Sequence, residues 1–230
     1  MARSSCGCMA QFIDKLRTFL FFKLMTIYLR YLIGFAFVFA SIVKIQGKRF
    51  TQIPATEPIG YFFEAMYSTG MYWNFLGWGQ FISGALLMTQ RFSTVGAMVF
   101  LPVILNVFMI THSIDFGSGT PLVTTLMLLG TIYLIAWDYK KWIILFYPDH
   151  RIKLDLTTQP RDQFMTHPIW TVTGIIFIVL SVYPWMFQWR HFALWCLLMV
   201  VIGVGTFVIM MVMRRRIEAT ATDLSVVKSV

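Results

Sequence analysis

The stretch GAMVFLPVILNVFMITHSIDFGSGTPLVTTLMLLGTIYLIAW, which runs from Gly96 to Trp137, decides the fold of this chain. It consists of two long apolar runs joined by a short polar turn, and each run is long enough to cross the hydrocarbon core of a membrane as a helix. Polar side chains inside these runs, such as Asn106, are costly against lipid and should face other helices or a cavity. The stretch therefore predicts a transmembrane helical hairpin.

The composition of the whole chain agrees with this interpretation. Of the 230 residues, 58% are hydrophobic and 13% are charged, and the mean hydropathy is +0.70, which lies outside the range of soluble globular domains. The net charge of +9 comes from short basic clusters between apolar runs, as in cytoplasmic loops, and does not indicate a nucleic-acid-binding surface. We therefore expect a multi-pass protein of the lipid bilayer, with no nucleic acid as a partner.

Six apolar runs are long enough to be transmembrane helices, so the sequence predicts an all-α membrane protein with six spans. The segment 44–71, between the first two runs, is rich in proline and aromatic residues, which favours a position at the membrane interface. The six runs lie at about 24–43, 72–88, 95–110, 121–137, 168–187 and 192–213.

Polar segments divide the chain into five parts. The first is a basic amphipathic segment, which is either a helix on the membrane surface or a solvated tail. A four-helix membrane bundle, a cytoplasmic linker, a C-terminal transmembrane hairpin and a polar tail follow. The boundaries of the five parts are 1–23, 24–145, 146–166, 167–215 and 216–230.

The distribution of basic residues predicts the orientation in the membrane. With six spans, both termini lie on the same side. Fourteen of the 19 lysine and arginine residues fall on that side and four on the other, while Arg30 lies inside a span. Because loops rich in lysine and arginine stay in the cytoplasm, we expect both termini to be cytoplasmic.

Arg30 is the only charged residue well inside a predicted span. It shares one helix face with a set of residues that follow it at spacings of four and three, namely Gly34, Phe37, Ser41 and Lys44. Arg30 could hold an anionic group or the head of a lipid or quinone, or its long side chain could extend to the cytoplasmic headgroups.

Gln80 is the polar residue of interest on the second span. The nearby Gly77 and Gly84 are a heptad apart, and such small residues favour close packing of membrane helices. The amide of Gln80 could form a hydrogen bond with Arg30 or Asn106 across the bundle.

Asn106 follows Pro102 by one helical turn on the third span. Because proline cannot donate a hydrogen bond to the carbonyl of Met98, a kink is expected beside the polar side chain. Asn106 therefore either lines a small polar pocket or forms an interhelical hydrogen bond without a ligand.

Few other residues indicate a catalytic or metal-binding site. His112 and Asp115 lie three residues apart on a turn, where a solvated pair is preferred over two metal ligands, so no metal site is expected. Cys6 and Cys8, near the start of the chain, are interpreted as bystanders. The motifs G-x-S-x-G, H-E-x-x-H, G-x-x-x-x-G-K-[ST] and C-x-x-C are missing, so no catalytic residue is identified.

The run LRYLIGFAFVFASIVKIQG, from Leu29 to Gly47, resembles the opening helix of the DoxX family of small membrane proteins. An arginine, a glycine one turn later and a lysine at the helix end recur in that family, and Arg30, Gly34 and Lys44 stand at the matching places. The runs GWGQFISGALLMTQRFSTVGAMV and GTPLVTTLMLLGTIYLIAWDYKKW are similar to the remaining helices of the family. The resemblance covers residues 24–142.

The resemblance implies a four-helix membrane bundle in the bacterial inner membrane. For some relatives it also implies a redox role, as a quinone-reducing thiosulfate dehydrogenase subunit or as a membrane partner of antioxidant enzymes. Two features depart from the family: some relatives carry an acidic residue near the place of Gln80, and the last two spans have no counterpart in the minimal bundle.

The functional hypothesis is a membrane subunit of a quinone-linked or other redox system. Arg30, Gln80 and Asn106 would bind an amphipathic ligand, a quinone or a lipid, and no covalent cofactor is implied. Partner subunits would supply any metal or flavin. Two other classes stay open: a small-solute transporter or channel, in which the same residues line a path, and a non-catalytic assembly subunit that needs only the glycine faces.

Overall fold

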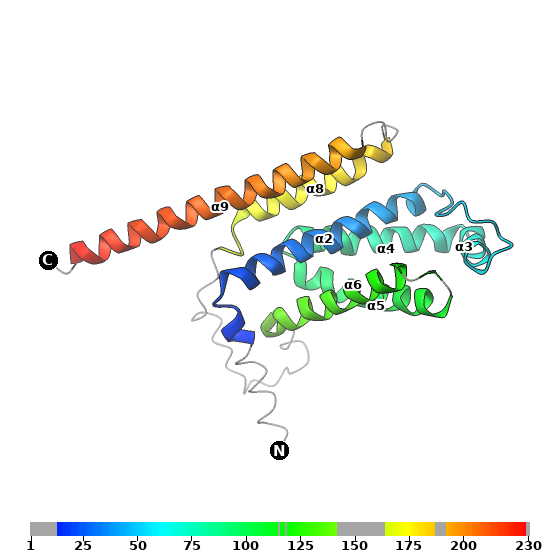
Figure 1. Cartoon of the computed structure of the whole chain (residues 1–230), viewed down its shortest axis with the longest axis horizontal. Coiled ribbons are helices and arrows are strands. Elements are labelled where there is room, and N and C mark those ends of the chain that lie inside the picture. The colour runs from blue at the N-terminus through cyan, green and yellow to red at the C-terminus, as the bar shows by residue number, and fades with distance from the viewer. Residues whose placement is uncertain (1–12, 115, 118, 142–163, 187–191, 229–230) are drawn as a thin grey trace, which may run out of the picture.

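The computed structural model describes residues 13–114, 116–117, 119–141, 164–186 and 192–228, and these parts of the chain contain helices and no strand. The long helices lie roughly parallel to one axis and alternate in direction along the chain (Figure 1). The helices are α2 (Leu20–Ile45), α3 (Pro58–Ser68), α4 (Met71–Met88), α5 (Ser93–Ser113), α6 (Gly119–Trp137), α8 (Pro168–Met186) and α9 (Phe192–Lys228).

Five of these helices are long and apolar enough to cross a membrane, namely α2, α5, α6, α8 and α9. The predicted second span corresponds to α4, which has 18 residues and includes the polar Asn74 and Gln80, and it is not among the five. The chain is therefore an all-helical, multi-pass membrane protein, as the composition predicts.

Close approach of α2 and α4 forms the centre of the bundle. The two helices run antiparallel, and a Cβ atom added to Gly84 would lie 2.8 Å from the carbonyl oxygen of Gly34. At the other end of the contact, a Cβ atom on Gly77 would lie 2.9 Å from the Cβ of Lys44. The expected role of these glycines in helix packing is confirmed, because larger residues would force the two backbones apart.

Helices α5 and α6 complete a four-helix bundle with α2 and α4. Phe37 of α2 meets Phe100 of α5 edge to face, with 4.4 Å between the ring centres. Both rings belong to a buried apolar cluster that all four helices share, formed by Ile33, Phe37, Leu87, Ala97, Phe100, Ile104 and Leu134. All four helices of this bundle lie between Leu20 and Trp137, and the predicted domain boundaries 24–145 stay a prediction.

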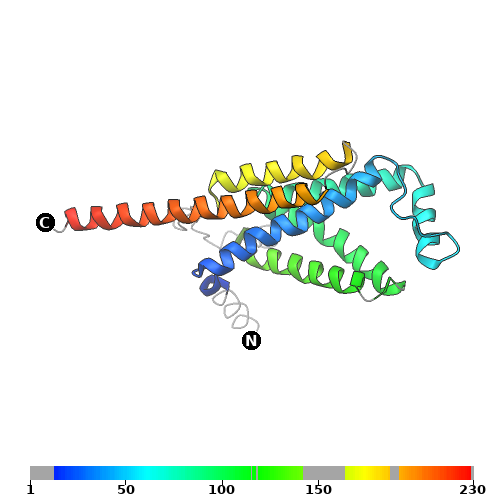
Figure 2. The same ribbon diagram turned by 45° about the horizontal axis from the view of Figure 1, so that its top comes forward.

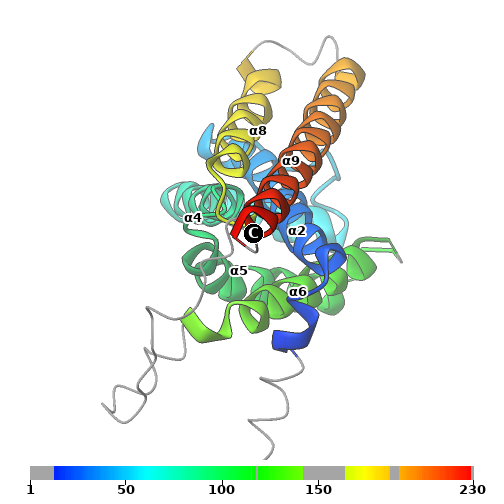
Figure 3. The same cartoon turned by 90° about the vertical axis from the view of Figure 1, so that its left-hand side faces the viewer.

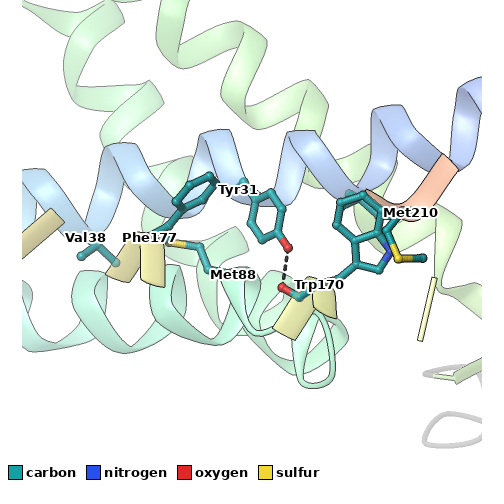
Figure 4. Close-up of a cluster of buried hydrophobic side chains, with 7 residues drawn as sticks. Tyr31, Val38, Met88, Trp170, Phe177 and Met210 are labelled. Atoms are coloured by element: carbon teal, nitrogen blue, oxygen red, sulfur yellow. Dashed lines mark hydrogen bonds between the residues drawn. The ribbon is translucent and has the colours of Figure 1, made fainter. Parts of the chain in front are cut away.

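The hairpin of α8 and α9 packs on α2 and α4, on the opposite side from α6 (Figures 2 and 3). Tyr28 and Tyr31 of α2 donate hydrogen bonds to the carbonyl oxygens of Gly203 and Trp170, respectively. Figure 4 shows Tyr31 and Trp170 within a second apolar cluster, which also contains Met88 and Phe177. The hairpin is therefore an integral part of the packed structure.

Several boundaries differ from the sequence-based expectation. Helix α2 begins at Leu20, so the end of the amphipathic segment 1–23 belongs to this helix. Helix α9 continues through most of the predicted polar tail to Lys228. The interfacial segment contains α3. Residues 1–12 and most of the linker 146–166 lie outside the described residues.

Candidate functional site

Arg30 lies at the end of the bundle where α2 begins and α6 ends. Its side chain is buried, and its Nη2 atom donates a hydrogen bond of 2.8 Å to Oδ2 of Asp138. Its Nη1 atom donates a second one of 3.0 Å to Oε1 of Gln90. Arg30 therefore neither extends to the headgroups nor bonds Gln80, two of the arrangements considered for it from the sequence; the anionic group that it holds is the carboxylate of Asp138. Its charge is neutralised within the protein.

Asp138, one residue after α6, has two further polar side-chain contacts. Thr94 donates to Oδ2 at 2.9 Å, and the Lys141 amine lies 2.9 Å from Oδ1. Burial alone would raise the pKa of the Asp138 carboxyl, but the charges of Arg30 and Lys141 and the hydrogen bonds from Lys141 and Thr94 outweigh it. The pKa therefore lies below its ordinary value, and the carboxylate stays ionised at neutral pH.

Gln90, in the turn between α4 and α5, completes the network around Arg30. Its backbone has a φ of 58°, a left-handed conformation that residues other than glycine seldom adopt. The buried amide accepts from Arg30 and donates to the carbonyl oxygen of Ile27 at 3.2 Å. The strained backbone holds this amide in place, so the network joins α2, α5, α6 and the α4–α5 turn.

Lys44, at the opposite end of α2, is buried without a comparable network. Its amine donates to the carbonyl oxygen of Ala40 at 3.1 Å and lies 4.2 Å and 5.4 Å from the ring centres of Phe50 and Trp73. The ring faces and the carbonyl end of α2 offset part of the positive charge. In the described part of the chain, no carboxylate lies within ion-pair distance of this amine.

Gln80 occupies the helix face that approaches Lys44. It is 4% exposed, and its Oε1 atom accepts no hydrogen bond from the described residues. Gly77, one turn earlier, lies so close to Lys44 that a Cβ atom added to it would be 2.9 Å from the Lys44 Cβ. We use the term polar strip for the four buried polar residues on the facing surfaces of α2 and α4, namely Ser41, Lys44, Gln80 and Ser83.

The hydroxyl groups of the polar strip do not satisfy its two larger residues. Ser41 donates to the carbonyl oxygen of Val38, and Ser83 donates to that of Gln80, so both bonds stay within their own helices. Within the part of the chain that the structure describes, the strip therefore contains a buried cation without an anion and a buried amide oxygen without a donor. Such groups are costly to bury unless something else pairs with them.

Asn106 is exposed on the outer surface of α5. The structure therefore does not bring together Arg30, Gln80 and Asn106, the three residues from which the sequence predicts a ligand site. Arg30 is neutralised at one end of the bundle, Gln80 belongs to the polar strip, and Asn106 faces outward.

A cleft of about 230 Å³ lies beside the polar strip, between α3 and the segment that follows α2. Arg49 and Glu64 line this cleft and form a bidentate ion pair, with two hydrogen bonds of 2.8 Å. The hydrogen bonds from Arg49 lower the pKa of the Glu64 carboxyl. Phe50 lines the cleft and also contacts the Lys44 amine. One aromatic side chain thus separates the buried cation from the cleft.

The remaining candidates form no cluster in the structure. Among the described residues, no three histidine, cysteine or acidic side chains converge as a metal site would require. His112 contacts the carbonyl oxygen of Phe108 and the hydroxyl of Thr125. Asp115, Cys6 and Cys8 lie outside the described residues.

Sequence reasoning missed the partners of Arg30. The sequence pattern singles out neither Asp138 and Gln90, which bond Arg30, nor Thr94, which bonds Asp138. One signal was available, because an arginine inside a membrane helix normally pairs with an acid, and Asp138 is the acidic residue directly after a span. No comparable sequence pattern indicates the left-handed backbone conformation of Gln90.

No protein-family model and no solved structure match this chain. In a comparison with curated proteins, the chain is similar to the uncharacterized protein YwoB of Bacillus subtilis (strain 168), with 29% identity over 76 residues. The match covers 33% of this chain and 48% of YwoB, so the chain spans about half the length of this curated relative. The resemblance to the DoxX family stays a prediction.

Proposed function

We propose that this chain is a membrane-embedded binding subunit that holds the polar head of an amphipathic ligand in the polar strip of α2 and α4. One observation carries the proposal: Lys44 and Gln80, on facing helices, are both buried and lack the partners that their charge and hydrogen-bonding capacity require. A ligand with an acceptor for Lys44 and a donor for Gln80 would satisfy both.

A quinol head, the reduced form of a quinone, has the chemistry that this strip requires. An oxygen of the head would accept from the Lys44 amine, and a quinol hydroxyl would donate to Oε1 of Gln80. Phe50 and Trp73, whose rings already contact Lys44, would add aromatic surface. When bound, the quinone would supply the electron-carrying chemistry, and redox partner subunits would exchange electrons with it, in agreement with the DoxX resemblance.

The proposal includes a six-span topology in the bacterial inner membrane, with both termini in the cytoplasm. Helix α4 is the sixth span, because it runs antiparallel to α2 along most of its length. The chain then enters α2 and leaves α9 at the same end of the bundle (Figure 1). The excess of lysine and arginine at that end supports the cytoplasmic assignment.

The test is equilibrium binding of a short-chain quinone in its reduced, quinol form to the purified full-length protein in mild detergent. Lys44→Met and Gln80→Met should each weaken binding about tenfold or more, because each removes a hydrogen bond that is buried when the ligand is present. The matched controls Lys48→Met and Gln46→Met change the same residue types at exposed positions. They should leave binding unchanged.

Other outcomes would point to the other two classes. Solute flux through liposomes that contain only this chain, lost in Lys44→Met, would support a transporter. Recovery in a larger complex, with no bound amphiphile and with unchanged assembly in Lys44→Met and Gln80→Met, would support an assembly subunit. Equal quinone binding by the strip variants and the wild type would contradict the proposed site.

A further inference from the structure

The outward surface of α5 carries a regular stripe of exposed residues. Their spacing alternates between four and three, which places them along one line of the helix, as at the a and d positions of a heptad repeat. We call this stripe the α5 seam, and its members are Val95, Val99, Pro102, Asn106 and Met109. All of them except Asn106 are apolar.

Asn106 lies deep within the membrane-spanning part of α5. The helix runs from Ser93 to Ser113, so the helical rise places Asn106 about 20 Å from one end and about 10 Å from the other. At this depth water is scarce, and the carboxamide is too short to extend to the headgroups. Its side chain makes no hydrogen bond with the described residues, and lipid tails offer none. A protein partner is therefore needed for this group.

The outward surface of α6 provides a comparison. Its most exposed large side chains are all apolar, as expected for contact with lipid alone, and comprise Leu122, Val123, Leu126, Leu129 and Ile132. The α5 seam differs from this surface because it carries one polar side chain, that of Asn106, at a heptad position. A single asparagine at such a position sets the register and partner number of packed helices.

We propose that the α5 seam binds the α5 seam of a second copy of this chain, with the two Asn106 side chains paired at the centre. The two seams have complementary charge, because the Asn106 carboxamide carries partial positive charge on its NH₂ group and partial negative charge on its oxygen. Across a two-fold axis each Asn106 both donates to and accepts from the other, so the seam is complementary to itself. The apolar members pack on either side of this pair.

This dimer is independent of the proposed ligand site. The polar strip lies between α2 and α4, whereas the seam lies on the outside of α5, so neither surface covers the other. A protein that dimerises without binding a quinone, or binds a quinone without dimerising, would separate the two proposals.

The test reconstitutes the full-length protein in liposomes over a range of lipid-to-protein ratios and measures its monomer–dimer equilibrium by energy transfer between labelled copies. The wild type should dimerise. Asn106→Leu should weaken the dimer about tenfold, whereas Asn106→Gln, which keeps the carboxamide, should retain most of the affinity. Leu126→Val, on the outward surface of α6, should have no effect. Because Asn106 is exposed and unbonded, Asn106→Leu should keep the thermal stability of the monomer.

A second measurement locates the interface. In a background from which the three native cysteines are removed, Val99→Cys should form a symmetric cross-link between two copies, and Leu126→Cys should not. A monomer at all ratios would overturn the proposal, as would a dimer that Asn106→Leu leaves unchanged or that cross-links through position 126. A different protein captured on this surface would also overturn it.

Discussion

Two basic residues of α2 have opposite environments, although both are buried. Arg30 donates to Asp138 and Gln90, while Lys44 contacts one carbonyl oxygen and two aromatic rings. A charge that is neutralised within the fold contributes to the architecture, whereas an uncompensated charge is a candidate for ligand binding. This difference indicates a structural role for Arg30 and supports the proposed binding role of Lys44.

The first prediction concerns the ion pair at Arg30. Asp138→Asn should lower the free energy of unfolding by about 3 kcal/mol, because it leaves the buried guanidinium without its counter-charge. Chemical or thermal unfolding in detergent measures this loss. Glu64→Gln, which breaks the exposed pair with Arg49, is the matched control and should have little effect. Equal stability of the two variants would show that Arg30 does not depend on Asp138.

The second prediction concerns acid. Asp138 has a lower pKa in the folded protein than the ordinary value of about 3.9 that it has when unfolded. Its stabilising contribution is therefore complete above the ordinary value and disappears as the pH falls through the lower, folded value. Unfolding midpoints measured from about pH 6 to about pH 2 should decline more steeply in the wild type than in Asp138→Asn. Parallel profiles would argue against this linkage.

The third prediction concerns Gln80. Without ligand, Gln80→Met should raise the unfolding midpoint, because it replaces a buried amide that lacks a donor with an apolar side chain of similar size. The expected gain is about 1 kcal/mol, together with weaker ligand binding. Opposite changes in stability and binding are typical of a functional site. A destabilised variant would show that the amide has a structural partner.

At the scale of helices, glycine positions determine how closely the elements approach one another. A Cβ atom on Gly174 of α8 would lie 1.9 Å from the carbonyl oxygen of Met88, at the end of α4. In contrast, a Cβ atom on Gly205 of α9 would meet nothing within 4 Å. The C-terminal hairpin therefore depends on one close backbone contact in addition to its hydrogen bonds from Tyr28 and Tyr31.

The fourth prediction tests this contact. Gly174→Ala should destabilise the protein by about 1 to 3 kcal/mol, because α8 must move away from α4 to accommodate the methyl group. Gly205→Ala is the control and should be neutral or slightly stabilising, since alanine favours helix more than glycine does. Thermal unfolding of the two variants gives the comparison. A neutral Gly174→Ala would mean that the hairpin adjusts freely on the bundle.

Apolar runs predict the helices of this chain well, because their length and composition are properties of the local sequence. The runs at 95–110 and 121–137 become α5 and α6 with two or three residues added at their ends, and Gly77 and Gly84 form the predicted close packing. Helix ends are less predictable, as α2 and α9 extend into basic and polar residues that tolerate helix equally well.

Contacts between distant residues could not be predicted in the same way. Asp138 lies 108 residues after Arg30, and the Gln90 amide reaches Arg30 through a backbone conformation that the sequence does not specify. Gln80 is selected from the sequence as a polar residue of interest, and in the structure it is buried and its Oε1 atom accepts no hydrogen bond from the described residues. Its predicted assignment to one site with Arg30 and Asn106 required knowledge of which helix faces meet. Side-chain type identifies candidates, and only packing shows which of them converge.

At the scale of the whole molecule, the two ends of the bundle differ in whether their buried polar groups are paired within the described residues. Charges are paired around Arg30, where α2 begins, whereas the far end of α2 combines Lys44, Gln80 and a cleft of about 230 Å³ beneath α3. An amphipathic molecule of the bilayer would complete this second end. The central claim is therefore that the polar strip holds such a molecule.

Native mass spectrometry of the full-length protein, purified in mild detergent without added ligand, tests this claim most directly when combined with analysis of the organic extract. We predict that the wild type retains a quinone or another bilayer amphiphile and that Lys44→Met and Gln80→Met release it, while Lys48→Met and Gln46→Met retain it. A wild-type protein without any bound amphiphile, or a ligand that is retained equally by all four variants, would contradict the account.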